Sequence, residues 1–209
     1  MGDVILKSIT LSSLEERYLE LSSSLVRTPT VKLTSPFLID LIKASQIYLK
    51  LECFQYSGTF KARGALSVAK QIPEKDKKFG ITAASAGNHA IAAAWAAKVE
   101  NLSAKVVMQT SANPFRISLA KTFGAEIIMK EGGVATFAEA DKLVREEKRT
   151  FIHPFDGVDT TLGAAGVGLE LIEDYTELDA VVVAVGGGGL ISGVAAAVKL
   201  KNSKCKVYG

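Results

Sequence analysis

The hydrophobic and polar positions of this chain follow two periods that alternate along its length. Short apolar and β-branched runs, typical of strands, are each followed by a longer segment with apolar residues at helical spacing. The pattern predicts strands over residues 46–53, 78–84, 105–109, 126–130, 150–153, 180–185 and 204–208, and helices over residues 13–23, 60–70, 88–98, 114–123, 134–147, 161–175 and 190–201. This alternation favours a doubly wound α/β fold with ligand sites at the carboxyl ends of the strands.

Local signals refine this prediction at the ends of the chain. Ser12 and Ser13 stand before Glu15 and Glu16 at the spacing of a capping box, which places the start of the first helix there. The β-branched run over 180–185 is typical of a central parallel strand. Because the chain stops within its last predicted strand, we expect the natural protein to be longer.

Composition and charge narrow the class of protein. Apolar residues make up 48% of the 209 residues, and the net charge of +3 comes from scattered residues rather than a basic stripe, so we expect no nucleic-acid partner. No apolar stretch has the length of a membrane span, and the N-terminus lacks the pattern of a secretory signal. Cys53 and Cys205 are too few for a disulfide framework or a metal site, so we expect a reduced, cytoplasmic protein.

The first segment with candidate chemistry is the run Ser57–Gly64, where a predicted strand gives way to a helix. It contains Lys61, whose amine can act as a nucleophile only when it is unprotonated. Partial desolvation by Phe60 and the neighbouring cation Arg63 are candidates for lowering its pKa. The structural alternative is a surface lysine in the first turn of an amphipathic helix.

The second segment is the turn Ser85–Ala86–Gly87–Asn88–His89, which follows the strand ending at Ala84. A turn of this kind that opens a helix directs backbone N–H groups and the asparagine side chain at one point, which suits a carboxylate or phenolate oxygen. The structural alternatives are an ordinary N-cap and a histidine that serves packing alone.

The third segment contains four successive glycines, Gly186, Gly187, Gly188 and Gly189, between a predicted strand and a helix. Bare backbone at a helix N-terminus lets a phosphate approach closely, and the helix dipole favours its charge. The segment does not fit the dinucleotide fingerprint, which belongs to the first βα unit and needs an acidic residue after the next strand.

Together the three segments provide a reactive amine, an oxygen-binding turn and a phosphate cradle, the parts needed to hold pyridoxal 5'-phosphate. The chain resembles the fold-type II pyridoxal-phosphate enzymes and, within that group, the serine/threonine dehydratases and their serine racemase relatives. The resemblance is carried by five runs of sequence, namely residues 49–55, 57–65, 85–89, 153–156 and 185–190.

The resemblance implies a tryptophan synthase β-like architecture with two doubly wound parallel-sheet domains. The small domain would span residues 80–153. The large, cofactor-binding domain would comprise residues 1–79 and 154–209 and would be incomplete at its C-terminal end. A homodimer is implied for the full-length protein.

The resemblance also implies roles for individual residues. Lys61 would form the Schiff base, Phe60 would pack on the cofactor ring, and Asn88 would bond the ring hydroxyl. The glycines Gly186–Gly189 would wrap the phosphate. The turn residues Ser85, Ala86, Gly87, Asn88 and His89 would receive the carboxylate of the substrate, and no metal site is implied within the chain.

The implied reaction is dehydration of L-threonine or L-serine to a 2-keto acid and ammonia. Lys61 would remove the α-proton before the β-hydroxyl leaves. In the resembling racemases a serine stands at the position of Ala86 and acts on the opposite face of the cofactor; alanine has no proton to give, which favours dehydration over racemisation.

Other readings stay open at this point. A shortened, non-catalytic α/β module for binding or assembly, an amino-acid racemase and a hydroxyaspartate dehydratase are the alternatives, and β-replacement is less favoured by the form of the Ser85–His89 turn. Where relatives carry Gly-Gln-Gly-Thr, this chain has Gly163–Ala164–Ala165–Gly166. The partner of the pyridine nitrogen would lie beyond Gly209.

Overall fold

A computed structural model describes residues 8–43 and 46–209. The helices are α2 (Leu11–Ser22), α3 (Pro36–Ile42), α4 (Lys61–Lys70), α5 (Glu74–Lys77), α6 (Asn88–Val99), α7 (Pro114–Thr122), α8 (Gly132–Glu147), α9 (Val158–Asp174) and α10 (Gly189–Lys201), with short 3-10 turns η1 (Glu52–Phe54) and η2 (Tyr56–Gly58). The strands are β1 (Thr30–Lys32), β2 (Tyr48–Lys50), β3 (Ile81–Ala84), β4 (Ala104–Gln109), β5 (Glu126–Lys130), β6 (Thr150–Phe151), β7 (Ala180–Val182) and β8 (Lys206–Tyr208). The predicted α/β class is confirmed.

The predicted elements are present, with ends that differ from the prediction by about three residues or fewer. The sequence pattern missed β1, α3 and α5, which are too short to show a period. It also misplaced the cap of α2, because the helix begins at Leu11. Thr10 is the N-cap and forms reciprocal hydrogen bonds with Ser13, at 3.2 and 2.9 Å, whereas the Ser12 hydroxyl bonds Glu16.

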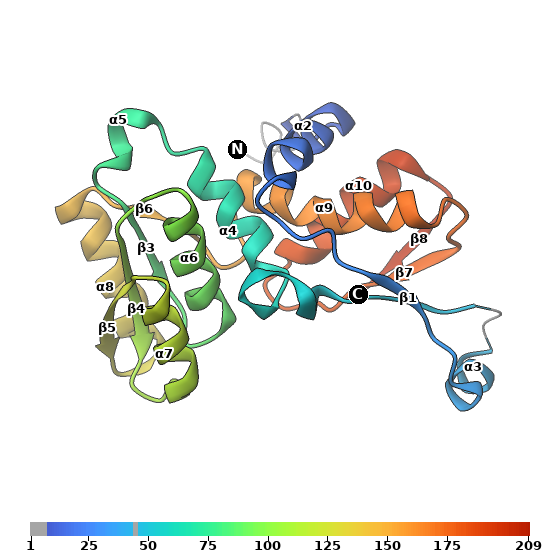
Figure 1. The fold of residues 1–209 in the computed structure, drawn as a ribbon, viewed down its shortest axis with the longest axis horizontal. Coiled ribbons are helices and arrows are strands. Elements are labelled where there is room, and N and C mark those ends of the chain that lie inside the picture. Colours follow the sequence, from blue (N-terminus) through green and yellow to red (C-terminus); the bar gives the residue numbers. More distant parts are fainter. Residues whose placement is uncertain (1–7, 44–45) are drawn as a thin grey trace.

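The four-stranded sheet has the order β5-β4-β3-β6, and all its strands are parallel. Helices α6 and α7 lie on one side of it and α8 on the other (Figure 1). Because successive side chains of a strand point to opposite faces, the strands contribute to two separate cores. Ile81 and Ala83 pack with α6, whereas Ala84 and Val107 pack with α8.

The second parallel sheet consists of β7 and β8, which lie beside α9 and α10 (Figure 1). Its inner face packs on these helices through Val181 and Val183. Among the residues described by the structure, β7 pairs with β8 alone, so the strand that we expected at the centre of a sheet lies at an edge. A third, antiparallel pair is formed by β1 and β2.

Helix α9 packs closely on both α4 and α10. A Cβ on Gly163 would lie 2.5 Å from the carbonyl oxygen of Arg63 in α4, and one on Gly193 in α10 would lie 2.6 Å from that of Thr161. Such distances leave room only for glycine. The small residues at 163–166, which departed from the family pattern, therefore serve close helix packing here.

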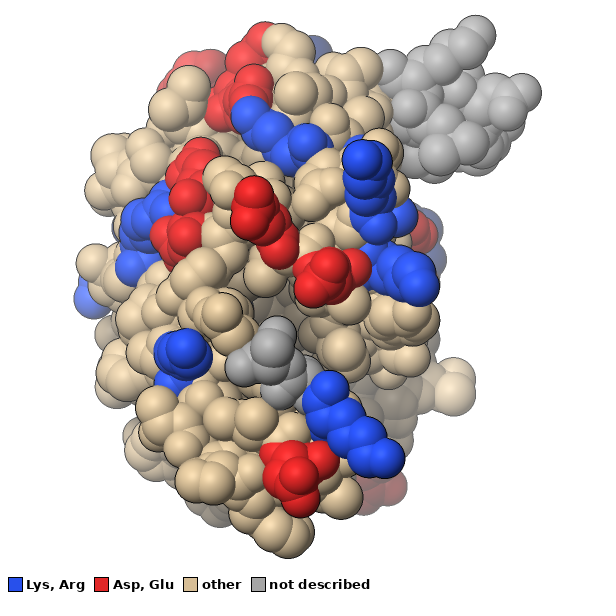
Figure 2. Space-filling view, turned by 90° about the vertical axis from the view of Figure 1, so that its right-hand side faces the viewer, with Lys and Arg blue, Asp and Glu red and all other residues tan. Residues whose placement is uncertain are grey.

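The surface and the cysteines add little to the fold. On the face seen in Figure 2, cationic and anionic side chains are interspersed. Within residues 8–43 and 46–209, no helix combines the length and apolar character needed to cross a membrane. Over the same ranges, no group of three or more His, Cys, Asp or Glu side chains is placed to hold a metal ion. Cys53 is exposed and Cys205 is buried, and both are free thiols.

Candidate active site

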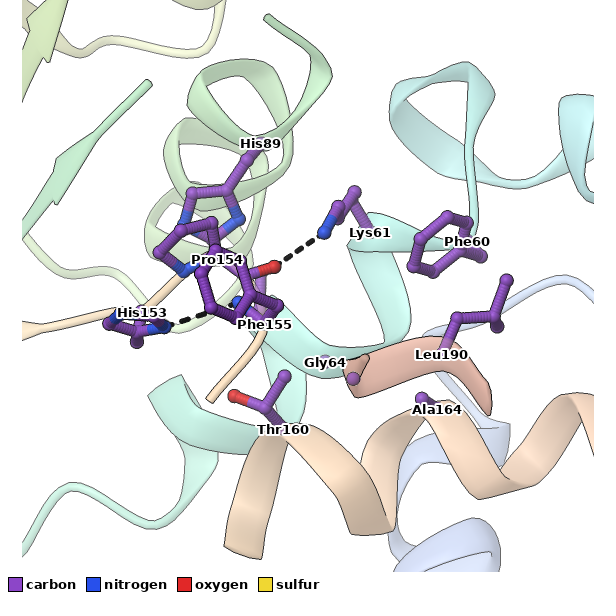
Figure 3. A pocket seen from close by; sticks show the side chains of 12 residues that line it. Phe60, Lys61, Gly64, His89, His153, Pro154, Phe155, Thr160, Ala164 and Leu190 are labelled. Atoms are coloured by element: carbon purple, nitrogen blue, oxygen red, sulfur yellow. Dashed lines mark hydrogen bonds between the residues drawn. The ribbon is translucent and has the colours of Figure 1, made fainter. Parts of the chain in front are cut away.

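Lys61 is the first residue of α4 and follows a tight turn. Ser57 and Gly58 both have positive φ angles there, 63° and 70°, which turn the chain sharply into the helix. The Nζ atom of Lys61 donates a hydrogen bond to the carbonyl oxygen of Pro154 (Figure 3) and lies 4.9 Å from the centre of the Phe60 ring. The amine therefore points into the protein rather than into solvent.

Burial lowers the pKa of Lys61 from its ordinary value of 10.5, which increases the fraction of neutral, nucleophilic amine. The expected help from Arg63 is not found. Its guanidinium turns away and forms ion pairs with Glu52 and Glu170, each at 2.8 Å, so two carboxylates compensate its charge. The suggestion that Arg63 lowers the pKa of Lys61 is wrong.

The turn Ser85–His89 joins β3 to α6. The Ser85 hydroxyl accepts a hydrogen bond of 3.1 Å from the Gly87 amide. No side chain in the described part of the chain caps α6, so the alternative of an ordinary N-cap does not apply. The first amides of the helix are therefore available to an anion, and the guanidinium of Arg116 lies 3.5 Å from where a Cβ on Gly87 would stand.

His89 is buried and neutral, with its proton on Nε2. Its Nε2 lies 2.8 Å from the carbonyl oxygen of Ile152, so Nε2 carries the proton and Nδ1 is an acceptor. Nδ1 is buried with no hydrogen-bond partner among the described residues. Burial is the main cause that lowers the pKa of His89 from 6.5 to about 4, with a smaller contribution from the charge of Lys61. The side chain is therefore neutral at physiological pH.

The glycine loop Gly186–Gly189 follows β7 and opens α10, whose N-cap Gly188 has a φ of +91°. Phe155 packs tightly against the loop. A Cβ on Gly187 would lie 2.1 Å from its ring, and one on Gly189 would lie 2.4 Å from its carbonyl oxygen. Larger residues are excluded at both positions. Gly186 and Gly187 are exposed before the N-terminal end of α10, whereas Gly189 is buried.

Five of the residues expected at the site surround one cleft of about 520 Å³. Its walls include Phe60, Lys61, Ser85, Asn88 and His89. A smaller adjoining cavity is lined by Lys61 and His89 together with Phe155 and Gly189. The remaining expected residues, namely Ala86, Gly87, Gly186, Gly187 and Gly188, line neither space.

Residues without an expected role also contribute to the site. Glu52 and Cys53 form part of the cleft wall, and Pro154 binds the amine of Lys61. His153 accepts hydrogen bonds at Nδ1 from the amides of Phe155 and Asp156, and its ring packs edge-to-face on Phe155, with 4.6 Å between ring centres. The run 153–156 was one of the five runs that carried the resemblance, which was the available signal for its importance.

Comparison with known proteins agrees with this geometry. Residues 21–209 match the family described as "Pyridoxal-phosphate dependent enzyme". The chain is 44% identical over 168 residues to phenylserine dehydratase of Ralstonia pickettii, which covers 80% of this chain and 52% of the relative. It is 38% identical over 203 residues to L-threonine ammonia-lyase of Thermotoga maritima, covering 96% of this chain and 50% of the relative.

Solved structures of such proteins share the fold. Maize serine racemase superposes with a TM-score of 0.88 at 32% identity, over 95% of this chain and 60% of that chain. The chain spans about half the length of the curated relatives it matches. The match to the family nevertheless extends over nearly all of the present sequence, and it includes the lysine, the turn and the glycine loop. The chain belongs to the family of pyridoxal-phosphate dependent enzymes, whose cofactor is pyridoxal 5'-phosphate.

Proposed function

We propose that the protein is a dehydratase that converts L-threonine, L-serine or both to a 2-keto acid and ammonia. The carrying observation is the half-buried Lys61, with its lowered pKa, in one cleft with Ser85, Asn88 and His89. The names of two relatives, an ammonia-lyase and a dehydratase, support this reaction class. Both catalyse reactions on hydroxy amino acids according to those names.

The residues present fit the cofactor. Lys61 offers a desolvated amine, and the glycine loop before α10 offers backbone N–H groups that suit a phosphate, with Gly186 and Gly187 exposed. We assign Asn88, at the first position of α6, to the ring hydroxyl and Phe60 to the ring face. We also assign residues 80–153 to a small domain and the flanking segments to a large one.

The chemistry divides between the cofactor and the chain. When bound, the cofactor supplies an electron sink for the charge left at the α-carbon. The amine of Lys61, which burial keeps partly neutral, removes the α-proton. The amides of Asn88 and His89, at the positive end of α6, orient the carboxylate of the substrate. His89 is neutral, so it adds no charge to this anion site.

Ala86 favours elimination over racemisation. Its methyl group packs on the core beneath the turn and has no proton to donate. Racemisation needs an acid and a base on opposite faces of the substrate, whereas dehydration needs only one base on the face of Lys61. The relatedness to serine racemase in fold therefore does not extend to this position.

The test uses the natural-length protein with added pyridoxal 5'-phosphate. We expect keto-acid release from one or more members of a panel of serine, threonine, phenylserine and 3-hydroxyaspartate, and complete loss in Lys61→Ala. Lys70→Ala is the matched control, because Lys70 lies at the other end of α4, where it pairs with Glu100 at 3.2 Å.

Two results would replace the proposal. Formation of D-amino acid without keto acid would favour the racemase. A failure of the cofactor to bind, with the fold intact, would favour a non-catalytic module. We expect the full-length protein to act as a homodimer, which sedimentation measures directly.

A further inference from the structure

Arg63 is the most deeply buried cation in the described part of the chain, with 1% of its side chain exposed. It lies two residues after Lys61, on the first turn of α4. Its Nε and Nη2 atoms donate to the two carboxylate oxygens of Glu52 at 2.8 and 2.9 Å. Its Nη1 and Nη2 atoms donate to the two oxygens of Glu170 at 2.8 and 2.9 Å. Both carboxylates are thus held by two hydrogen bonds each.

The two carboxylates belong to different elements of the fold. Glu52 is in η1 and lines the cleft, whereas Glu170 is in α9. Lys50 also pairs with Glu170 at 2.7 Å, and the Thr28 hydroxyl donates to Glu52 at 2.6 Å. Lys50 also lies 3.7 Å from Asp174, which pairs with Arg27, so each cation of the cluster faces carboxylates. This balance agrees with the finding that burial is the cause of the lowered pKa of Lys61.

We propose that Arg63 is a positioning residue, which fixes the first turn of α4 between η1 and α9 and so holds the amine of Lys61 at the cleft. The inference rests on the role of Lys61 proposed above. Two flat guanidinium–carboxylate pairs set both the distance and the rotation of the helix turn. A single point charge could set only the distance.

The packing around Arg63 leaves little freedom. Its carbonyl oxygen lies 2.5 Å from the position of a Cβ on Gly163, and its Nη1 lies 3.1 Å from the position of a Cβ on Gly166. A buried ion cluster contributes little net stability compared with apolar residues of the same size, because desolvation costs about as much as the attraction returns. We therefore expect the cluster to fix the position of the first turn of α4, and we expect its loss to change the reactivity of Lys61 more than the stability of the fold.

The experiment compares Arg63→Lys with Arg17→Lys. Arg17 is also largely buried, with 9% exposed, and it also binds α4, through the Ser67 hydroxyl, and bonds Asp159 at 3.0 Å. Both variants keep the charge and remove a guanidinium that fixes α4, from α4 itself at Arg63 and from α2 at Arg17. Arg17, however, holds the helix six positions beyond Lys61, away from the cleft.

The readout is the rate at which pyridoxal 5'-phosphate becomes covalently linked to the protein, followed by absorbance and by borohydride trapping at several pH values. We expect Arg63→Lys to slow this rate by about tenfold to about 100-fold, as a displacement near 1 Å does for a reacting group. The pH midpoint should stay in place, since the charge is retained. Arg17→Lys should remain within about twofold of the parent.

The outcomes separate the two hypotheses. If the parent protein forms no linkage, the proposed function fails. If the parent reacts and both variants react alike, Arg63 is structural only and the inference is overturned. If Arg63→Lys does not fold, Glu170→Gln is measured instead, because it keeps the shape and removes one charged partner. An unchanged rate in that variant also overturns the inference.

Discussion

Two strand–turn–helix units contribute to the candidate site, and they are built differently. In the first, β3 leads through Ser85–His89 into α6, within a sheet of four strands that helices cover on both faces. In the second, β7 leads through Gly186–Gly189 into α10, within a sheet of two strands. The outer face of that sheet is open, with Val182 81% exposed and its cross-strand neighbour Tyr208 50% exposed.

The difference shows what each turn depends on. The first turn rests on a complete core, so it can use polar side chains, such as the Ser85 hydroxyl and the ring of His89, in fixed orientations. The second turn has no side chains of its own and offers only backbone amides. Its shape depends on a neighbour, Phe155, and on the packing of α10 against α9. The first unit thus offers polar side chains to a ligand, whereas the second lets a ligand approach its backbone closely.

Acid should weaken the first unit more than the second, because it contains the buried His89. Its pKa is about 4 in the folded protein and 6.5 when free, so the unfolded chain binds a proton that the native state does not. The stability is full above about pH 6.5 and falls as the pH drops toward 4, by about 3 kcal/mol in total and about 2 kcal/mol by pH 5.

Urea unfolding between pH 7.5 and 5 measures this loss, above the range in which most carboxyl groups titrate. His89→Gln should flatten the pH dependence. The same slope in that variant would contradict the assignment to His89. Residues 180–201, in the second unit, contain no histidine.

The next largest effect is expected from valine-to-alanine substitutions, which should destabilise the protein by different amounts in the two sheets. Val107 in β4 is fully buried against α8, so Val107→Ala should lower the free energy of unfolding by about 2 kcal/mol, from lost apolar burial and the cavity left. Val182→Ala in β7 should change it by less than about 0.5 kcal/mol. Urea midpoints compare the same substitution in two strands. An equal loss at Val182 would show that the outer face of β7 is covered in the natural protein.

The smallest expected effect distinguishes the two turns. Gly187→Ala forces a Cβ into the Phe155 ring and should weaken the binding of pyridoxal 5'-phosphate about tenfold, which corresponds to about 1.4 kcal/mol. Gly87→Ala meets only an ordinary contact with Arg116, at 3.5 Å, and should stay within about threefold. Absorbance titration gives both constants. Equal losses would mean that Phe155 does not shape the loop.

The two units were also unequally predictable from sequence. The strands and helices from β3 to α8 followed from periodicity, because a sheet covered on both faces gives continuous apolar runs. The run over 180–185 has the same character, yet β7 extends only over Ala180–Val182 and pairs on one side. The hydrophobicity of a segment shows that it can be buried, but it does not show which strands pair with it. Short elements such as α3 and α5 have too few residues to show a period.

The residues of the candidate site could be predicted from the sequence, but the contacts that these residues make could not. Lys61, Asn88 and the glycine loop stood out because unusual residues follow strands at the edge where ligands bind. The roles of Pro154 and Phe155 did not, since they act through a backbone carbonyl and a ring position that no local pattern encodes.

By itself the sequence determined the α/β class, the family and the three segments that contribute to the candidate site, because periodicity and turn chemistry are local properties. Only the tertiary structure decided what Arg63 does. Its partner Glu170 is 107 positions away, so no spacing rule links them, and a cation that looked like a means to lower the pKa of Lys61 is neutralised by carboxylates. Charge effects depend on distance in space and on burial, which the fold alone sets.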